Sequence, residues 1–189
     1  MEAACVRRRH LQILKQLVRT IDPVPPPKPY DCFDMIGGGG TDGRIAIMFG
    51  RVRKSVNECI DAYVTLSDPV VEKKHHCVNI NGEIQRQFDS EDLKQAMREI
   101  IRSPGLREDV LLKDAPEAKC KVFVCATSRE TSATARLTYR SPRGRGSVPS
   151  RKIWEVSRAT SSFFDPITLG IYGQGFVDGA TGMNNPVCE

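Results

Sequence analysis

The chain has 189 residues, of which 40% are apolar and 27% are charged, a composition typical of one globular domain with its own core. Its formal charge of +5 is mild and only 6% of its residues are aromatic, which argues against a base-stacking nucleic-acid platform. No apolar run is long enough to span a membrane, so we expect a cytoplasmic protein. Seven irregularly spaced cysteines predict reduced, mostly buried thiols.

The first third of the chain predicts a helix, a rigid connector and a glycine turn. The helix covers residues 8–21, where apolar side chains recur at helical spacing: Leu11, Leu14, Leu17, Val18 and Ile21. Prolines then make residues 22–29 an extended connector. Residues 33–48 are typical of a short strand, a turn of consecutive glycines and the apolar face of a helix.

Two further helices are predicted from their N-terminal signals. Ser55 and Glu58 match a capping box, which predicts a helix that runs to about Leu66. A second amphipathic helix is expected to be capped within residues 89–90 and to stop before Pro104.

The second half of the chain predicts the strands. Residues 121–127 contain an apolar run, which indicates a strand buried on both faces, and residues 135–139 alternate like a partner strand. A helix begins at Ile153, and residues 163–166 and 176–180 are typical of strand and turn. The alternation of strands and helices predicts an α/β layered domain.

The glycine turn is compatible with three kinds of site, of which the dinucleotide fingerprint is the first. Gly38, Gly40 and Gly43 give a literal match to its spacing. The fingerprint also requires an acid about 20 residues further on, at the end of a second strand. The acids at that distance, Glu58 and Asp61, lie inside a predicted helix, which disfavours this interpretation.

The phosphate loop and the hydrolase nucleophile elbow are the other two. A phosphate loop needs Lys and a hydroxyl residue after its last glycine, where this chain has Arg44 and Ile45. An elbow needs Gly-x-Ser-x-Gly. Its nucleophile position holds Gly40 and its closing position holds Asp42, so the local chemistry alone rejects the elbow too.

The histidines limit the catalytic arrangements and metal sites. His10, His75 and His76 all precede the candidate acid Asp178, which excludes a hydrolase ordered Ser, Asp, His. The run His75-His76-Cys77 has no partner at ligand spacing, so it predicts a solvated loop. We therefore expect neither a metal nor a cofactor.

Segments along nearly the whole chain carry one family resemblance: residues 29–38, 45–48, 50–56, 88–93, 111–116, 121–127, 139–144, 153–155, 158–161, 177–180 and 184–186. They resemble patatin-like phospholipase domains, especially the fungal proteins related to calcium-independent phospholipases. The resemblance implies a three-layer α/β/α domain with a mainly parallel central sheet over residues 1–189, truncated at its C-terminal end. It also implies a serine–aspartate dyad that hydrolyses acyl esters of phospholipids.

The resemblance also assigns roles to residues. Asp178, with Gly179 and Ala180, matches the turn whose aspartate accepts the proton. Arg7 alone survives from the motif that supplies oxyanion donors, and Gly40 stands where the nucleophilic serine is expected. Side chains where the family has glycines disfavour the oxyanion geometry. The resemblance therefore predicts a lipid hydrolase domain whose catalysis is impaired or absent.

The expected partners follow from the same resemblance: phospholipid or another acyl lipid, contact with a membrane surface, and fused or partner signalling domains, but no nucleic acid. Two alternatives stay open at this point. One is a non-catalytic module that binds lipid or a partner and keeps the α/β shell. The other is a decayed fragment that folds poorly.

Overall fold

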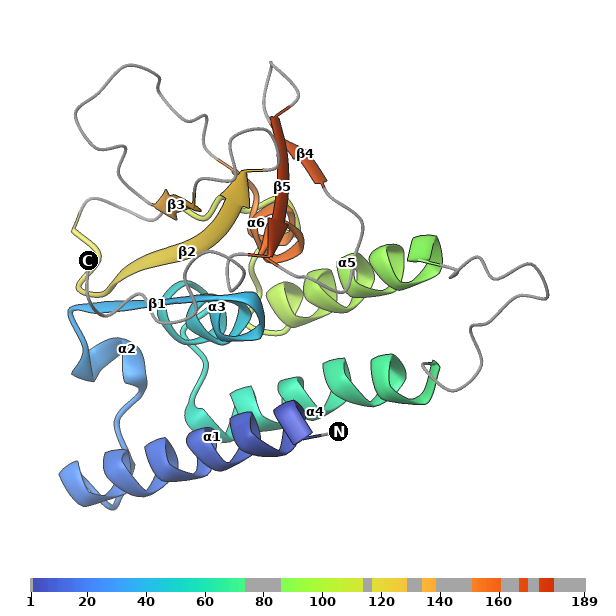
Figure 1. Ribbon diagram of the computed structural model, residues 1–189. Coiled ribbons are helices and arrows are strands. Elements are labelled where there is room, and N and C mark those ends of the chain that lie inside the picture. The colour runs from blue at the N-terminus through green and yellow to red at the C-terminus, as the bar shows by residue number, and fades with distance from the viewer. Residues whose placement is uncertain are drawn as a thin grey trace.

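The computed structural model describes residues 2–73, 86–113, 117–128, 134–138, 151–160, 167–169 and 174–178. Its helices are α1 (Glu2–Ile21), α2 (Pro29–Cys32), α3 (Gly40–Ala46), the π-helical turn η1 (Ile47–Arg51), α4 (Val56–Lys73), α5 (Arg86–Arg102) and α6 (Ile153–Ala159). Its strands are β1 (Met35–Gly39), β2 (Lys121–Ser128), β3 (Thr134–Thr138), β4 (Ile167–Leu169) and β5 (Gln174–Asp178) (Figure 1).

Strand β2 is the centre of the sheet. It pairs in parallel with β1 and antiparallel with β3 and β5, and β4 pairs antiparallel with β5. The mixture of helices and a covered sheet confirms the α/β class predicted from the alternation of elements. The described pairings are mostly antiparallel, however, so the mainly parallel sheet that we expected is seen only at β1 and β2.

The helices bury one row of side chains from β2. Val122, Val124 and Ala126 alternate along the strand and belong to the same hydrophobic core as buried residues of α4, α5, α6 and η1. Helix α3 packs on β1 and β2, α6 packs on β4 and β5, and α5 packs on α6. Helices α1 and α4 contact each other and lie below the sheet in Figure 1. A second helical layer on the other face is not identified in the described residues.

The capping box predicted at the start of α4 is confirmed. The Ser55 amide donates to the Glu58 carboxylate at 2.7 Å, and the Glu58 amide donates to the Ser55 hydroxyl at 3.3 Å. The helix then continues to Lys73, past the predicted end. Helix α5 begins at Arg86, so the predicted cap within residues 89–90 is wrong. Asp89 lies in the first turn of the helix instead, where an acid interacts favourably with the helix dipole.

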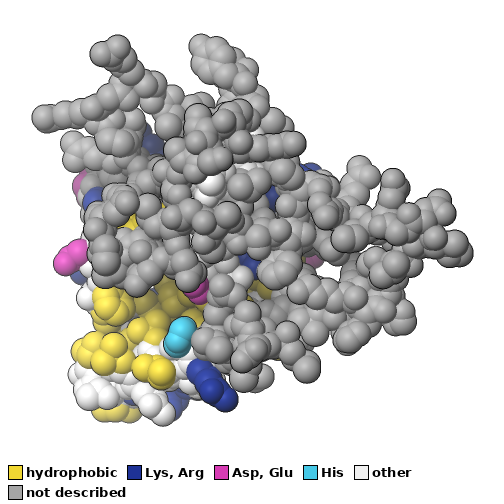
Figure 2. Space-filling view, viewed as in Figure 1, with side chains coloured by type: hydrophobic (Ala, Val, Ile, Leu, Met, Phe, Trp, Pro, Cys, Tyr) yellow, Lys and Arg dark blue, Asp and Glu magenta, His cyan; other side chains and the backbone are white. Residues whose placement is uncertain are grey.

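Helix α1 exposes part of the face that was predicted to be buried. Leu11 and Val18 are buried and Leu14 packs against the core. Leu17 is 50% exposed and Ile21 is 61% exposed, and Ile13, which lies on the same side of the helix, is 62% exposed. Figure 2 shows hydrophobic side chains gathered on the surface around α1 and α2. Only one stripe of α1 contacts the core, because α4 covers it from one side.

Four cysteines lie in positions whose side chains are described, and all are free thiols: Cys32, Cys59, Cys120 and Cys125. The last three are buried, as the sequence predicted. Burial raises the pKa of the Cys59 thiol to about 12, so this group stays protonated and unreactive at neutral pH.

Candidate functional site

The glycine run forms a sharp strand-to-helix turn. Strand β1 ends at Gly39, which has extended backbone angles, and α3 begins at the next residue. Gly40 has a φ of 59°, in the left-handed region that glycine adopts without a steric penalty. This residue stands at the position where the sequence comparison with an elbow places the nucleophile. The turn therefore has the strand–turn–helix shape of an elbow but presents no nucleophilic side chain.

Two glycines allow β1 and α3 to approach each other. A Cβ atom on Gly38 would lie 2.7 Å from the carbonyl carbon of Asp42 and 2.9 Å from the Gly43 amide nitrogen. A Cβ on Gly43 would lie 3.0 Å from the Gly38 oxygen and 2.9 Å from a methyl group of Val124. Gly43 thus takes the close-packing role that the elbow pattern assigns to position 42. The contact joins Gly43 of α3 to Gly38 of β1, and the elbow pattern does not include position 43.

The structure agrees with one requirement of the dinucleotide fingerprint but not with the other. The third glycine of that fingerprint allows a helix and a strand to pack closely, and Gly43 has this close contact. The strand that pairs in parallel with β1 is β2, and its sequence from Lys121 to Ser128 contains no acid. Glu58 and Asp61 lie in α4, as predicted. The structure therefore offers no carboxylate on β2 for a ribose.

A buried threonine holds the turn in place. The Gly40 amide donates to the Thr160 hydroxyl at 2.7 Å, and that hydroxyl donates to the Cys125 carbonyl at 2.7 Å. Thr160 directly follows α6 and is fully buried. One side chain thus joins the elbow, the central strand and the end of a distant helix. Sequence reasoning missed this role, because no local pattern marks a hydroxyl that bonds across 120 residues.

A hydroxyl and a cation lie beside the turn. Thr41, the residue after Gly40, accepts a 3.0 Å hydrogen bond from the Arg44 guanidinium one turn along α3. Arg44 is buried, whereas Thr41 is half-buried. The guanidinium therefore places a positively charged group next to the turn.

The register of the sheet places Asp178 near the elbow. Residues 123–125 of β2 pair with both β1 and β3, and residues 126–127 pair with both β3 and β5. Strand β3 therefore occupies one edge of β2, and β1 and β5 follow each other along the opposite edge. Gly39 pairs with Cys125 and Asp178 pairs with Ala126, so the C-terminal ends of β1 and β5 meet (Figure 1).

This meeting point is where a dyad between positions 40 and 178 would be assembled. Successive residues of β2 are about 3.4 Å apart along the strand, which brings the backbones of Gly39 and Asp178 close together. The side chain of Asp178, and the turn residues Gly179 and Ala180, lie outside the described part of the chain.

Arg7 lies in a different setting from the one that the resemblance implies. Its backbone belongs to α1, which packs against α4. Helical amides beyond the first turn bond to carbonyls of the same helix, so they are not available as oxyanion donors. The side chain of Arg7 is outside the described residues.

The described residues contain neither a metal-ligand cluster nor a membrane-spanning helix. No group of three His, Cys, Asp or Glu side chains that could hold a metal ion occurs among the described residues. The run His75-His76-Cys77 and the strand predicted at residues 163–166 lie outside them. None of the described helices combines the length and apolar character needed to cross a membrane.

Comparison with known proteins adds no relative. The chain matches no family model and no curated protein. Its resemblance to patatin-like domains therefore stays a prediction from the sequence segments.

Proposed function

We propose that this chain is a patatin-like lipid acyl hydrolase domain, of three-layer α/β/α type, in which ester hydrolysis is impaired. The observation that carries the proposal is the left-handed Gly40 at a strand-to-helix turn. A turn of this shape projects whatever side chain it carries above the end of the sheet. The meeting of the β1 and β5 ends, with Asp178 as the last residue of β5, supports the same proposal.

The proposed impairment follows from the chemistry of a dyad. The aspartate takes the proton of the serine hydroxyl while the serine oxygen attacks the acyl carbonyl. Water later hydrolyses the acyl-enzyme. Gly40 has no oxygen to attack with, so no acyl-enzyme forms at this position. In a serine protease, loss of the nucleophile lowers turnover by roughly 10⁶-fold. The remaining rate, about 10³–10⁴-fold above that in water, depends on the oxyanion hole and on substrate binding.

The test restores the missing groups. We expect the Gly40→Ser, Asp42→Gly double variant to release fatty acid from phospholipid vesicles and from short-chain esters, whereas the native chain does not. Adding Asp178→Ala to the double variant should abolish that activity. A matched control, Gly40→Ala with Asp42→Gly, carries the same backbone strain without a hydroxyl and should be inactive.

Two outcomes contradict the proposal. A double variant that unfolds cooperatively but shows no hydrolysis would mean that Asp178, the pocket and the oxyanion donors are not arranged for acyl transfer. Hydrolysis by the native chain that disappears with Asp178→Ala would mean that another nucleophile, such as the Thr41 hydroxyl, serves the site, so the chain would not be impaired.

A second candidate function, a non-catalytic module that binds lipid or a partner, is favoured by the exposed stripe on α1. Ile13, Leu17 and Ile21 are all at least half exposed and are spaced four residues apart. Exposed Arg9 and Arg19 lie on the same helix. A helix with an exposed apolar stripe and basic residues is typical of elements that lie on anionic membrane surfaces.

Sedimentation with vesicles tests this candidate. The native chain should sediment with vesicles that contain anionic phospholipid, and Ile13→Gln with Leu17→Gln should remain in the supernatant. Leu111→Gln removes an exposed apolar side chain from the α5–α6 region and serves as the matched control. Equal sedimentation of all three proteins would contradict the role of α1.

A further inference from the structure

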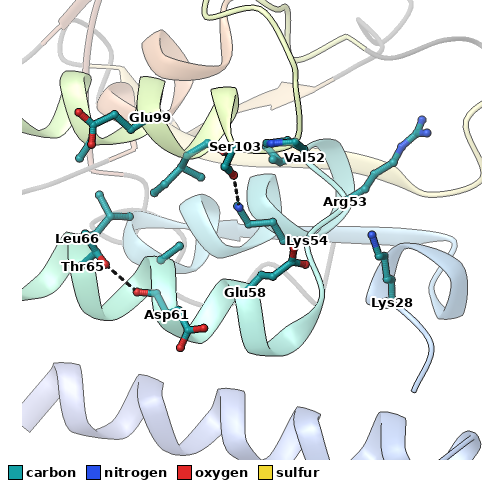
Figure 3. A pocket seen from close by; sticks show the side chains of 14 residues that line it. Lys28, Val52, Arg53, Lys54, Glu58, Asp61, Thr65, Leu66, Glu99 and Ser103 are labelled. Atoms are coloured by element: carbon teal, nitrogen blue, oxygen red, sulfur yellow. Dashed lines mark hydrogen bonds between the residues drawn. The ribbon is translucent and has the colours of Figure 1, made fainter. Parts of the chain in front are cut away.

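A cavity whose lining includes no residue of the glycine turn contains Lys54, a lysine with one hydrogen-bond partner among the described residues. It has a volume of about 480 Å³ and lies between the η1–α4 junction, the first turns of α4 and the last turn of α5 (Figure 3). Pockets that bind small molecules have volumes of about 300–1,000 Å³. Its apolar wall includes Val52, Leu66 and Ile100, and Lys54 and Ser103 lie at its centre.

An irregular backbone brings Lys54 into this cavity. The chain leaves α3 through the π-helical turn η1, and the Lys54 amide then donates to the Met48 carbonyl at 2.9 Å. Between them, Arg53 has a φ of 59°, in the left-handed region that a non-glycine residue adopts only with strain. The Arg53 guanidinium stacks over the Tyr30 ring at 4.4 Å, whereas Lys54 points the other way (Figure 3).

Lys54 is buried as a residue, and its ammonium has one hydrogen-bond partner in the described part of the chain. Lys54 is only 8% exposed, and its Nζ donates to the Ser103 hydroxyl at 2.6 Å. That hydroxyl donates onward to the Ile100 carbonyl. An ammonium has three N–H donors, so two are left for other groups. The negative end of the α5 dipole, near Ser103, offsets part of the cost of burying this charge.

The neighbouring acids do not neutralise Lys54 by direct contact. No ion pair joins Lys54 to a carboxylate in the part of the chain that the structure describes. Glu58 uses its carboxylate to cap α4. The hydrogen bonds from Ser55 lower the pKa of Glu58 most, and the nearby charges of Lys28 and Lys54 add to that lowering. Asp61 and Glu99 are exposed, and Figure 3 shows their carboxylates pointing away from the Lys54 ammonium. Exposed charges are screened by water, so the buried charge of the cavity is positive.

We propose that this cavity binds a small organic anion, a carboxylate or a phosphate monoester with a short apolar body. The anionic group accepts hydrogen bonds from the two remaining N–H groups of the Lys54 ammonium, and the apolar body packs on Leu66 and Ile100. Exposed Lys28 at the rim adds positive charge. This site is separate from the elbow, so the inference goes beyond the proposed hydrolase function and does not depend on it.

Calorimetric titration at constant ionic strength tests the proposal. The probes are hexanoate and hexyl phosphate, with inorganic phosphate and hexanol as probes that carry only the charge or only the apolar body. We expect saturable binding of hexanoate or hexyl phosphate that is tighter than binding of either single-feature probe. The preference between these two distinguishes a carboxylate from a phosphate ligand.

Three variants locate the binding. Lys54→Met keeps the length of the side chain without its charge and should weaken binding at least about tenfold. Ala62→Leu keeps Lys54 but fills the cavity and should also weaken binding, so the proposal stays testable if one variant does not fold. Lys113→Met removes an exposed lysine elsewhere and should bind like the native chain.

Three results would overturn the proposal. These are no saturable binding of hexanoate or hexyl phosphate, unchanged affinity in folded Lys54→Met, or inorganic phosphate that binds as tightly as hexyl phosphate. Any of them would leave Lys54 as a cap of the α5 C-terminus alone.

Discussion

The amide of Gly40 donates a 2.7 Å hydrogen bond to the hydroxyl of Thr160, although 120 residues separate them in the chain. The same hydroxyl donates to the carbonyl of Cys125 on β2 at the same distance. All three groups are buried, so water cannot replace either bond. The conformation of the glycine turn thus depends on the end of α6 as well as on the glycines.

Thr160→Val should therefore destabilise the fold by about 1–3 kcal/mol, because it removes the hydroxyl that accepts from the buried Gly40 amide and donates to the Cys125 carbonyl. Thr160→Ser retains the hydroxyl and loses one methyl group, so its cost should be about 1 kcal/mol. Urea denaturation of both variants and the native chain measures the difference. Equal free energies of unfolding for the two variants would show that the hydroxyl does not support the turn.

Gly38→Ala should cost at least twice as much stability as Gly105→Ala. The new methyl group on residue 38 would meet the backbone of Asp42 and Gly43 within 3.0 Å, and backbone atoms in a packed helix cannot yield cheaply. Gly105 has a φ of 83° and no atom within 4 Å of its added Cβ, so only conformational strain of about 1–2 kcal/mol applies there. Thermal and urea unfolding of both variants test this comparison.

Leu11→Ala and Leu17→Ala should differ strongly although both leucines lie on α1. Leu11 is buried in the core, so its truncation should cost about 2–4 kcal/mol. Leu17 is half exposed, and its truncation should change the unfolding free energy by less than about 1 kcal/mol. A large loss at Leu17 would indicate that this stripe of α1 is covered in solution, for example by a second copy of the chain.

The capping box should make stability depend on pH. The hydrogen bond from the Ser55 amide is the main cause that holds the pKa of Glu58 below its ordinary value of 4.5. A lowered pKa in the folded state contributes stability that is fully present above 4.5 and is lost as the pH falls through the folded value.

Glu58→Gln removes this titration and keeps a side chain that can complete the capping box. We expect its unfolding free energy to fall less steeply than that of the native chain as the pH is lowered below 4.5. Urea denaturation across that acidic range makes the comparison, and parallel profiles for the two proteins would contradict it.

The sequence alone determined the elements whose signals are local. The Ser55–Glu58 capping box, the apolar strand at residues 121–127 and the glycine turn at residues 37–40 were all predicted from their own residues. Each depends on hydrogen bonds or side-chain periodicity within a few positions, so a short window contains the physical cause.

The tertiary structure decided what depends on distant partners. The bond from Gly40 to Thr160, the meeting of the β1 and β5 ends beside Asp178, and the burial of Lys54 next to Ser103 each join segments far apart in the chain. The exposure of one side of α1 was also decided by the tertiary structure, because the spacing of its apolar residues is the same whether or not a neighbour covers them. Burial is a property of packed neighbours, and a sequence pattern states which side chains are apolar but not which neighbours cover them.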